Sequence, residues 1–235
     1  MKKAILASTS TLHGQDYLEY LVPHLNKLYG HNKEIIFIPY ARPGGISHAN
    51  YTARAKEAFK KANLNIKGIH EFENPDEAIK KGEGIFTGGG NTFLLVSELY
   101  RNGVMEILQQ AIKDGKPYMG TSAGTNISGL TMGTTNDMPI ILPKSFKTLG
   151  LVPFNINPHY LDPDVNSTHK GETRETRIKE FHHFNSQPVV GLREGSWLEL
   201  DDNEIILRGE PSARIFKCNE EAYEVATGTI LTTLN

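Results

Sequence analysis

The sequence predicts an α/β fold built on a mostly parallel, twisted sheet with helices on both faces. Short apolar strands alternate with helical segments through the first half of the 235-residue chain, as in parallel β-α-β units. Glycine-rich segments follow two of these strands, at residues 88–92 and 120–124. The last third changes to short strands separated by turn residues, which predicts a small antiparallel C-terminal extension of the sheet.

The strands of the first half are recognised by apolar runs that end at turn residues, and the helices by apolar residues at helical spacing. Residues 35–38, for example, are stopped by Pro39, whereas Leu18, Leu21 and Leu25 recur along one helical face. In chain order we expect strand 3–8, helix 15–28, strand 35–38, helix 49–62, strand 65–72, a short helix from Asn74, strand 84–87, helical structure to Asp114 and strand 117–119. In the last third we expect strands 188–193, 196–200, 204–208 and 214–217.

Composition narrows the function classes. The formal net charge of −2 argues against a nucleic-acid or membrane surface as the main partner. The apolar run 4–7 is shorter than a signal peptide requires, and no run approaches the roughly 20 residues of a membrane span. The single cysteine, Cys218, excludes an intramolecular disulfide and a cysteine-rich zinc site. The sequence has no internal repeat or linker, so we expect a single domain over residues 1–235. Without a signal peptide or membrane span, we expect it to be cytoplasmic.

Gly120-Thr121-Ser122-Ala123-Gly124 fits the G-x-S-x-G pattern of a nucleophile elbow. A serine at the apex of a tight strand-to-helix turn has strained backbone geometry, and small residues two positions before and after it let the chains pass closely. The N–H of Ala123 then points to where an oxyanion would form. The pattern also occurs by chance in glycine-rich loops, so the serine needs partners elsewhere.

A serine nucleophile needs a base, and the base needs an orienting group. Among nine histidines, His159 follows a strand-like run and the Asn157-Pro158 pair, although a structural histidine at a strand end is also common. Glu194 closes an expected strand before Gly195, and Asp162 and Asp164 compete with it as the orienting acid. The order Ser122, His159, Glu194 differs from the Ser, acid, His order of an α/β-hydrolase.

Residues 88–92, Gly-Gly-Gly-Asn-Thr, could cradle a phosphate or complete an oxyanion hole. The G-x-G-x-x-G pattern fails at Phe93, and the P-loop ending is absent, so backbone N–H groups of Gly89 and Gly90 beside Ser122 are the preferred interpretation. The sequence has neither an H-E-x-x-H motif nor a paired acidic loop, which argues against a metal site.

Six blocks together resemble the peptidase E family of serine peptidases, the α-aspartyl dipeptidases, over nearly the whole chain. They are Gly-Gly-Gly-Asn-Thr-Phe at 88–93, Ser-Ala-Gly at 122–124, Thr-Thr-Asn-Asp-Met-Pro at 134–139, Ile-Asn-Pro-His at 156–159, His-Lys-Gly-Glu-Thr-Arg-Glu at 169–175 and Gly-Leu-Arg-Glu-Gly at 191–195. Thr121 departs from the pattern, because well-known members carry a tryptophan beside the nucleophile. The shape of the neighbouring pocket wall is therefore open.

The resemblance implies a three-layer α/β sandwich related to the class I glutamine amidotransferases, which is also flavodoxin-like. It implies a triad of Ser122, His159 and Glu194 that hydrolyses dipeptides with N-terminal aspartate without a cofactor, and it leaves a homodimer open. For the substrate's charges we expect Arg174 to bind the aspartyl carboxylate, with Lys170 and Arg177 as rivals, and Asp137 to bind the ammonium group. These charged residues could also be a solvated surface.

Two other functions are alternatives. A cyanophycinase-like peptidase would share the site but release β-aspartyl-arginine from a polymer, and a pocket open to long chains would favour it. A flavodoxin-like nucleotide-binding module would use residues 88–92, and would bind a nucleotide without serine-dependent turnover.

Overall fold

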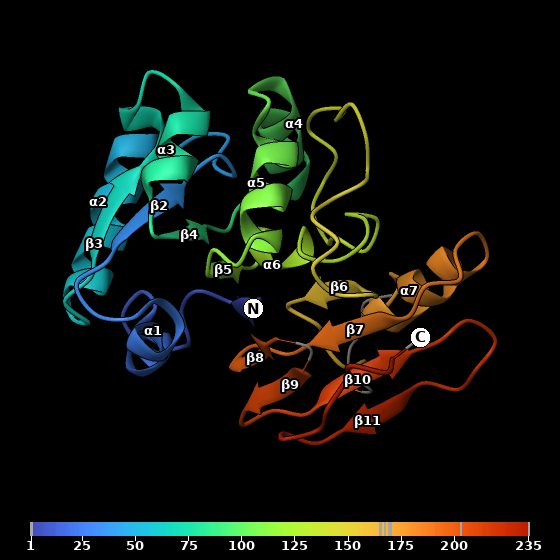
Figure 1. The fold of residues 1–235 in the computed structure, drawn as a ribbon. Helices are drawn as coiled ribbons and strands as arrows, with labels where there is room; N and C mark the ends of the chain where they lie inside the picture. The colour runs from blue at the N-terminus through green and yellow to red at the C-terminus, as the bar shows by residue number, and fades with distance from the viewer. Residues whose placement is uncertain (1, 165, 167, 169–170, 203, 235) are drawn as a thin grey trace.

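Two β-sheets form the framework of the protein in the computed structural model, which describes residues 2–164, 166, 168, 171–202 and 204–234 (Figure 1). The larger sheet has seven strands in the order β3-β2-β4-β5-β1-β8-β9. They are β1 (Lys3–Ala7), β2 (Glu34–Ile38), β3 (Asn65–Gly68), β4 (Gly84–Thr87), β5 (Tyr118–Thr121), β8 (Ser196–Asp201) and β9 (Glu204–Gly209).

Strands β1 to β5 pair in parallel. β8 continues the sheet antiparallel to β1, and β9 pairs antiparallel to β8. This arrangement confirms the mostly parallel sheet and its antiparallel extension. β4 and β5 are neighbours in the sheet, so the loops after them lie side by side at its carboxyl edge. That edge is where open α/β sheets place their ligands.

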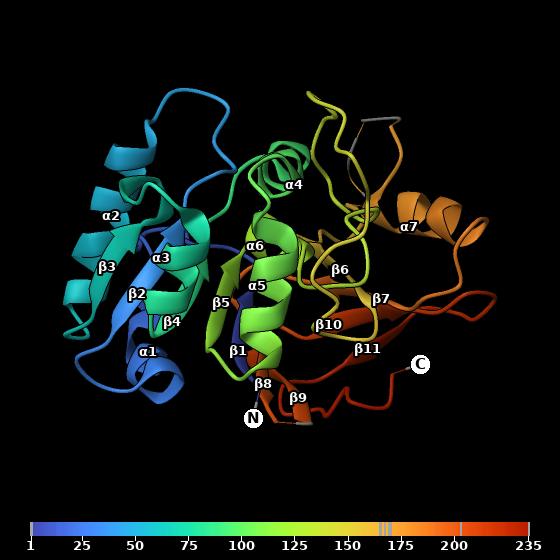
Figure 2. The same ribbon diagram turned by 45° about the horizontal axis from the view of Figure 1, so that its top comes forward.

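Helices cover both faces of the larger sheet (Figures 1 and 2). On one face Leu25 of α1 and Phe59 of α2 pack with Phe37 and Phe86 of the sheet. On the other face Leu95 of α4 and Leu108 of α5 join a core that also contains Leu6, Ile38 and Ile85, among others. The helices are α1 (Val22–Tyr29), α2 (His48–Lys60), α3 (Pro75–Lys81), α4 (Thr92–Arg101), α5 (Val104–Lys113), α6 (Ala123–Asn126) and α7 (Arg174–His182).

The smaller sheet is a finding that the sequence did not predict. Its strands, in the order β11-β10-β7-β6, are β6 (Asn155–Pro158), β7 (Val189–Leu192), β10 (Ala213–Phe216) and β11 (Tyr223–Val225). The expected strands 188–193 and 214–217 therefore lie in this second sheet and do not extend the first. Gly195, at φ 90°, turns the chain from β7 in one sheet into β8 in the other.

Two helix boundaries also differ from the expectation. Leu18 adopts a left-handed conformation at φ 61° and is followed by a 3-10 turn over Glu19–Leu21, so α1 begins only at Val22. The helical stretch after Thr92 is divided into α4 and α5 at Gly103, whose φ of 66° breaks the helix. Apolar spacing alone did not reveal these backbone reversals.

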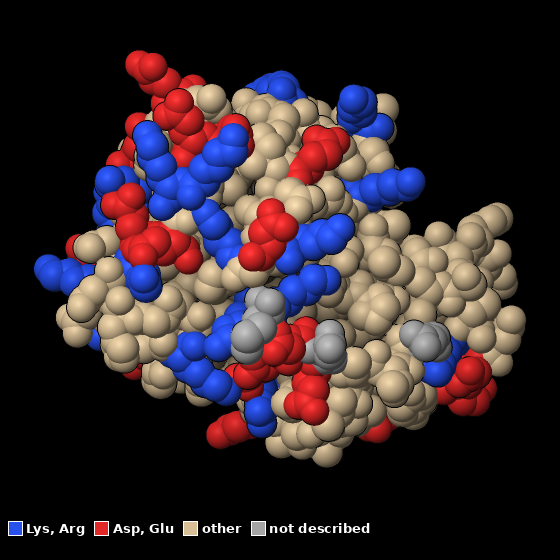
Figure 3. Space-filling model, viewed as in Figure 1, with Lys and Arg blue, Asp and Glu red and all other residues tan. Residues whose placement is uncertain are grey.

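The surface carries charges of both signs. On the face in Figure 3, basic and acidic side chains are interspersed. Several form ion pairs, such as Lys33 with Glu83 and Lys80 with Asp76, both at 2.6 Å. In the described part of the chain, no helix is long and apolar enough to cross a membrane.

Candidate active site

Ser122 lies at the apex of the turn from β5 into α6, with φ 53° and ψ −111°. This region is unfavourable for a residue with a side chain, so the surrounding contacts must hold it. Its N–H donates to Ala7 O of β1 at 3.1 Å. A Cβ atom on Gly120 would lie 2.4 Å from Gly124 O, and one on Gly124 would lie 2.3 Å from Thr87 O. Close packing therefore requires both glycines of the predicted elbow.

His159 follows β6 of the smaller sheet and also has a positive φ, 53°. Its N–H donates to Ser8 Oγ at 2.8 Å, and Ser8 Oγ in turn donates to Leu192 O of β7 at 2.7 Å. The side chain of Asn136 donates to Pro158 O at 2.7 Å. Hydrogen bonds from both sheets thus fix the backbone on which the imidazole stands.

The structure brings Ser122, His159 and Glu194 into one hydrogen-bonded row. His159 Nε2 lies 2.8 Å from Ser122 Oγ, and His159 Nδ1 lies 2.6 Å from Glu194 Oε1. A carboxylate accepts and does not donate, so it assigns the proton of the neutral imidazole to Nδ1 and leaves Nε2 to accept from the serine. The row is open to solvent, because the Glu194 side chain is 50% exposed.

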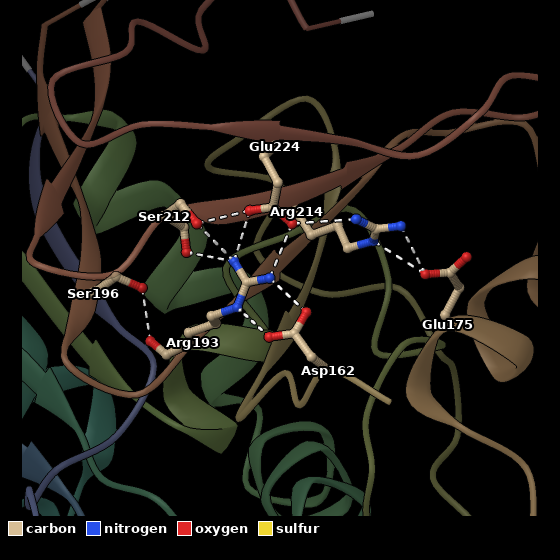
Figure 4. A network of polar contacts seen from close by, with 7 residues as sticks. All are labelled: Asp162, Glu175, Arg193, Ser196, Ser212, Arg214 and Glu224. Atoms are coloured by element: carbon tan, nitrogen blue, oxygen red, sulfur yellow. Dashed lines mark hydrogen bonds and ion pairs between the residues drawn. The ribbon is translucent and has the colours of Figure 1, made fainter. Parts of the chain in front are cut away.

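A network of charged side chains surrounds Arg193, the residue before Glu194 (Figure 4). The neighbouring Arg193 binds Asp162 at 2.6 Å and Glu224 at 2.8 Å, and its Nη1 also donates to Ser212 O. These pairings hold the pKa of Glu224 well below its ordinary value, at about 2, chiefly through hydrogen bonding to Arg193. Arg193 likewise lowers the pKa of Asp162.

The two rival acids have other partners. Asp162 pairs with Arg193, and Asp164 Oδ1 accepts from Asn166 N at 2.9 Å. Glu194 is the acid at hydrogen-bond distance from His159.

The backbone N–H groups of Gly89, Gly90 and Ala123 have no hydrogen-bond acceptor among the described residues. A Cβ atom on Gly89 would lie 2.9 Å from Ser122 Cβ, so this segment passes directly beside the elbow. Gly90 has φ 143°, and a Cβ atom there would lie 2.2 Å from Ala41 O. Only glycine permits this path, and the path leaves donors beside a nucleophile.

Asp137 is held rigidly at the first turn of α4. Its Oδ2 accepts from Thr92 N at 2.7 Å, from Thr92 Oγ1 at 2.6 Å and from Thr135 Oγ1 at 3.0 Å. Among the described residues, none donates to Oδ1. One oxygen thus fixes the carboxylate, and the other can accept from a ligand.

Arg174 is the first residue of α7 and is half-buried. Within the described part of the chain its guanidinium has neither an ion pair nor a hydrogen bond, although Asp137 is close enough to act on its charge. Desolvation lowers its pKa, the Arg177 charge lowers it further, and Asp137 opposes the shift. It lines an open cavity of about 570 Å³ together with Asn136 and Asp162.

The other residues expected near the substrate are less well placed to contact it. Arg177 is exposed and contacts Glu172 at 3.8 Å, and Lys170 lies outside the described residues. Thr121 is fully buried in β5, so its side chain is not exposed at the site. A larger cavity, about 780 Å³, lies between α3 and α5 and contains none of the residues above. Within the described ranges, no cluster of three histidine, cysteine or acidic side chains could hold a metal ion.

Ser8 and Asn126 are the structural residues that sequence reasoning missed. Asn126, one turn after Ser122, donates to Ile156 O of β6 at 2.8 Å. Both side chains are fully buried and join the two sheets. No local pattern in the sequence distinguishes these two residues from other polar residues near the ends of strands and helices.

Comparison with known proteins gives concordant results. The family model described as Peptidase family S51 matches residues 4–208. Peptidase E of Streptomyces coelicolor is 47% identical over 230 residues, covering 98% of this chain and 93% of the relative. A probable alpha-aspartyl dipeptidase of Drosophila melanogaster is 41% identical, covering 99% of this chain and 97% of the relative.

Solved structures support the same fold. A putative peptidase E from Listeria monocytogenes superposes with a TM-score of 0.68 at 23% identity, covering 90% of this chain and all of that one. A peptidase from an acI-B1 actinobacterium gives a TM-score of 0.71 at 16% identity, covering 98% of this chain and 96% of that one. At these identities the likeness concerns the fold alone.

Proposed function

The chain belongs to peptidase family S51, and on that premise we propose that it hydrolyses dipeptides with N-terminal aspartate through Ser122, His159 and Glu194. Membership of the family confirms the resemblance read from the sequence. The observation that carries the proposed mechanism is the row of contacts, 2.8 Å from Ser122 Oγ to His159 Nε2 and 2.6 Å from Nδ1 to Glu194 Oε1.

In the acylation step Ser122 Oγ attacks the peptide carbonyl carbon while His159 Nε2 takes the hydroxyl proton. Glu194 keeps the imidazole in this tautomer and stabilises the imidazolium that forms. The N–H groups of Ala123 and of Gly89 or Gly90 receive the oxyanion. His159 then returns the proton to the leaving amine, and water hydrolyses the aspartyl ester in a second cycle of the same groups.

Selectivity for aspartate is proposed to rest on Arg174 and Asp137. A substrate of this kind carries an ammonium group and a carboxylate close to the scissile bond, and both must be paired when they leave water. Arg174 offers an uncommitted guanidinium for the aspartyl carboxylate, which it can bind through two parallel hydrogen bonds. Asp137 offers Oδ1 to the ammonium group while Thr92 and Thr135 hold Oδ2.

The test is to measure kcat/KM on Asp-Leu, Asn-Leu and Glu-Leu for the wild type, Arg174→Met and Arg177→Met. Arg177, on the same helix, already contacts Glu172 and serves as the matched control. We expect the wild type to prefer Asp-Leu, and Arg174→Met to lose about 2–5 kcal/mol of transition-state stabilisation on Asp-Leu only. Arg177→Met should stay close to the wild type. If Arg174→Met weakens Asp-Leu and Asn-Leu equally, the aspartate receptor lies elsewhere.

A further inference from the structure

A second uncommitted guanidinium lies on the other side of the nucleophile from α7. Arg42 belongs to the loop 39–47 between β2 and α2, which rises above the carboxyl edge of the sheet on the α2 side (Figure 2). The segment 88–92 separates the two sides. Asp137 binds Thr92 at one end of this segment, and Tyr51 of α2 donates to Gly89 O at 3.2 Å at the other.

Arg42 has an unused capacity to donate hydrogen bonds. Its Cζ lies 4.9 Å from the centroid of the Tyr51 ring, a stacking contact that fixes the plane of the guanidinium. Its Nε is buried and has no hydrogen-bond partner, and no described carboxylate pairs with the side chain. Burying a donor without an acceptor costs free energy, so an anion that accepts a hydrogen bond from Arg42 would be bound favourably.

A chain of contacts connects the Arg42 guanidinium to Ser122. Tyr51 Oη touches Gly89, and Gly89 packs against Ser122. Arg54 adds a second positive charge, with its Cζ 4.7 Å from the Tyr17 ring centroid, and Tyr17 Oη lies 3.4 Å from Tyr51 Oη. Burial and Tyr51 raise the pKa of Tyr17, while the positive charges of Arg54 and Arg42 oppose the rise.

We propose that Arg42 binds the free α-carboxylate of the amino acid that leaves during hydrolysis. The inference rests on the proposed function, in which the aspartyl residue lies towards Asp137 and Arg174. The second residue of the dipeptide then extends past Ser122 to the α2 side, and its α-carboxylate is one residue from the scissile bond. A planar guanidinium matches a carboxylate through two parallel hydrogen bonds.

This assignment has a consequence for substrate length. A third residue converts the α-carboxylate into a neutral amide, which cannot neutralise Arg42. The site would thus select dipeptides by a charge on the leaving residue, independently of the aspartate receptor on the other side.

The test pairs a change in the protein with a change in the substrate. kcat/KM is measured on Asp-Leu and on Asp-Leu amide, which lacks only the terminal negative charge. We expect the wild type to prefer the acid by about 10- to 100-fold, the range for a partly exposed charged hydrogen bond. Arg42→Met should reduce this preference about tenfold or more by losing activity on the acid, and Arg42→Lys should retain part of it. Arg54→Met, which removes an exposed neighbouring cation, should keep most of the preference.

The inference is overturned if the wild type hydrolyses acid and amide equally well, a result that needs no variant to fold. It is also overturned if Arg42→Met keeps the full preference, or if Arg54→Met abolishes it. These outcomes differ from failure of the proposed function, in which neither Asp-Leu nor its amide would be hydrolysed.

Discussion

Ser122 and His159 stand in two regions of the molecule that are held together by different forces. The serine belongs to the seven-stranded sheet, where strain is imposed by dry, close contacts such as Gly124 against Thr87 O. The histidine and Glu194 belong to the four-stranded sheet, where exposed charges around Arg193 anchor the strand that carries the acid. Steric fit therefore positions the nucleophile, and electrostatics positions the acid that orients its base.

The contrast has a chemical logic. An oxyanion hole needs donors that do not move as charge develops, which close packing provides. The imidazole must gain and lose a proton, and a solvated carboxylate can stabilise its cation without a large desolvation cost. Ser8 and Asn126 join the two regions by hydrogen bonds to the β6 strand and the residue after it.

The largest effect should come from the nucleophile itself. Ser122→Ala is expected to reduce kcat on Asp-Leu by about a million-fold. The fold should be retained, because the substitution removes only the attacking oxygen. Stopped assays and thermal unfolding on the same preparation check this. A variant with a tenth of the wild-type rate would rule out the serine mechanism.

On the other side of the comparison, Glu194→Gln should reduce kcat by about 10²- to 10⁴-fold, because an amide no longer stabilises the imidazolium. Asp162→Asn is the matched control, since it changes an acid bound to the adjacent Arg193 without touching His159. Asp162→Asn should lower kcat much less than Glu194→Gln does. A greater loss for Asp162→Asn than for Glu194→Gln would mean that the orienting acid has been misassigned.

Ser8→Ala should weaken the junction between the regions. Removing the hydroxyl leaves His159 N without its acceptor and leaves Leu192 O with Tyr160 N as its donor. We expect about 10- to 100-fold lower kcat and about 1–3 kcal/mol lower stability. Ser128→Ala removes a buried hydroxyl that bonds Gly124 O at 3.0 Å, within the nucleophile region. It should cost similar stability with a smaller loss of kcat. Equal losses of kcat would show that Ser8 has no special role in positioning His159.

The smallest effect concerns acid stability. The pKa of Glu224 in the folded protein is depressed to about 2, chiefly by Arg193, whereas an unfolded glutamate titrates near ~4.3. Its contribution is therefore complete above about pH 4.3 and is lost as pH falls towards 2. Because the side chain is 42% exposed, we expect about 1 kcal/mol or less. The free energies of unfolding of the wild type and Glu224→Gln, measured with urea from pH 5 to pH 2, should become equal at low pH. A difference that stays constant with pH would show that Glu224 does not contribute to the loss of stability in acid.

Much of the nucleophile region follows from local sequence, because a five-residue spacing and the sterics of glycine define the elbow. The alternation of strands and helices also predicted the parallel sheet, which the structure confirms. Gly89, Gly90 and Ala123 were predicted from the same rules, and their catalytic roles stay predictions.

The base region follows less directly from sequence. His159 and Glu194 were candidates beside Asp162 and Asp164, because choosing the acid requires knowing which sheet β7 joins. That choice depends on the pairing of β6 with β7, more than 30 residues apart, and on the turn at Gly195. No local pattern marks Ser8, which bonds segments more than 150 residues away, and none marks Arg42. The single-domain prediction stays untested.

Labelling with a serine-directed reagent measures whether His159, beside the smaller sheet, activates Ser122 of the larger sheet. The wild type and His159→Ala are treated with a fluorophosphonate, the labelled residue is identified by peptide mass spectrometry, and the rate of labelling is measured. We expect Ser122 to carry the label, with a rate that falls by about 10³-fold or more in His159→Ala, because the general base is lost. Labelling at another residue, or an unchanged rate in His159→Ala, would contradict the account.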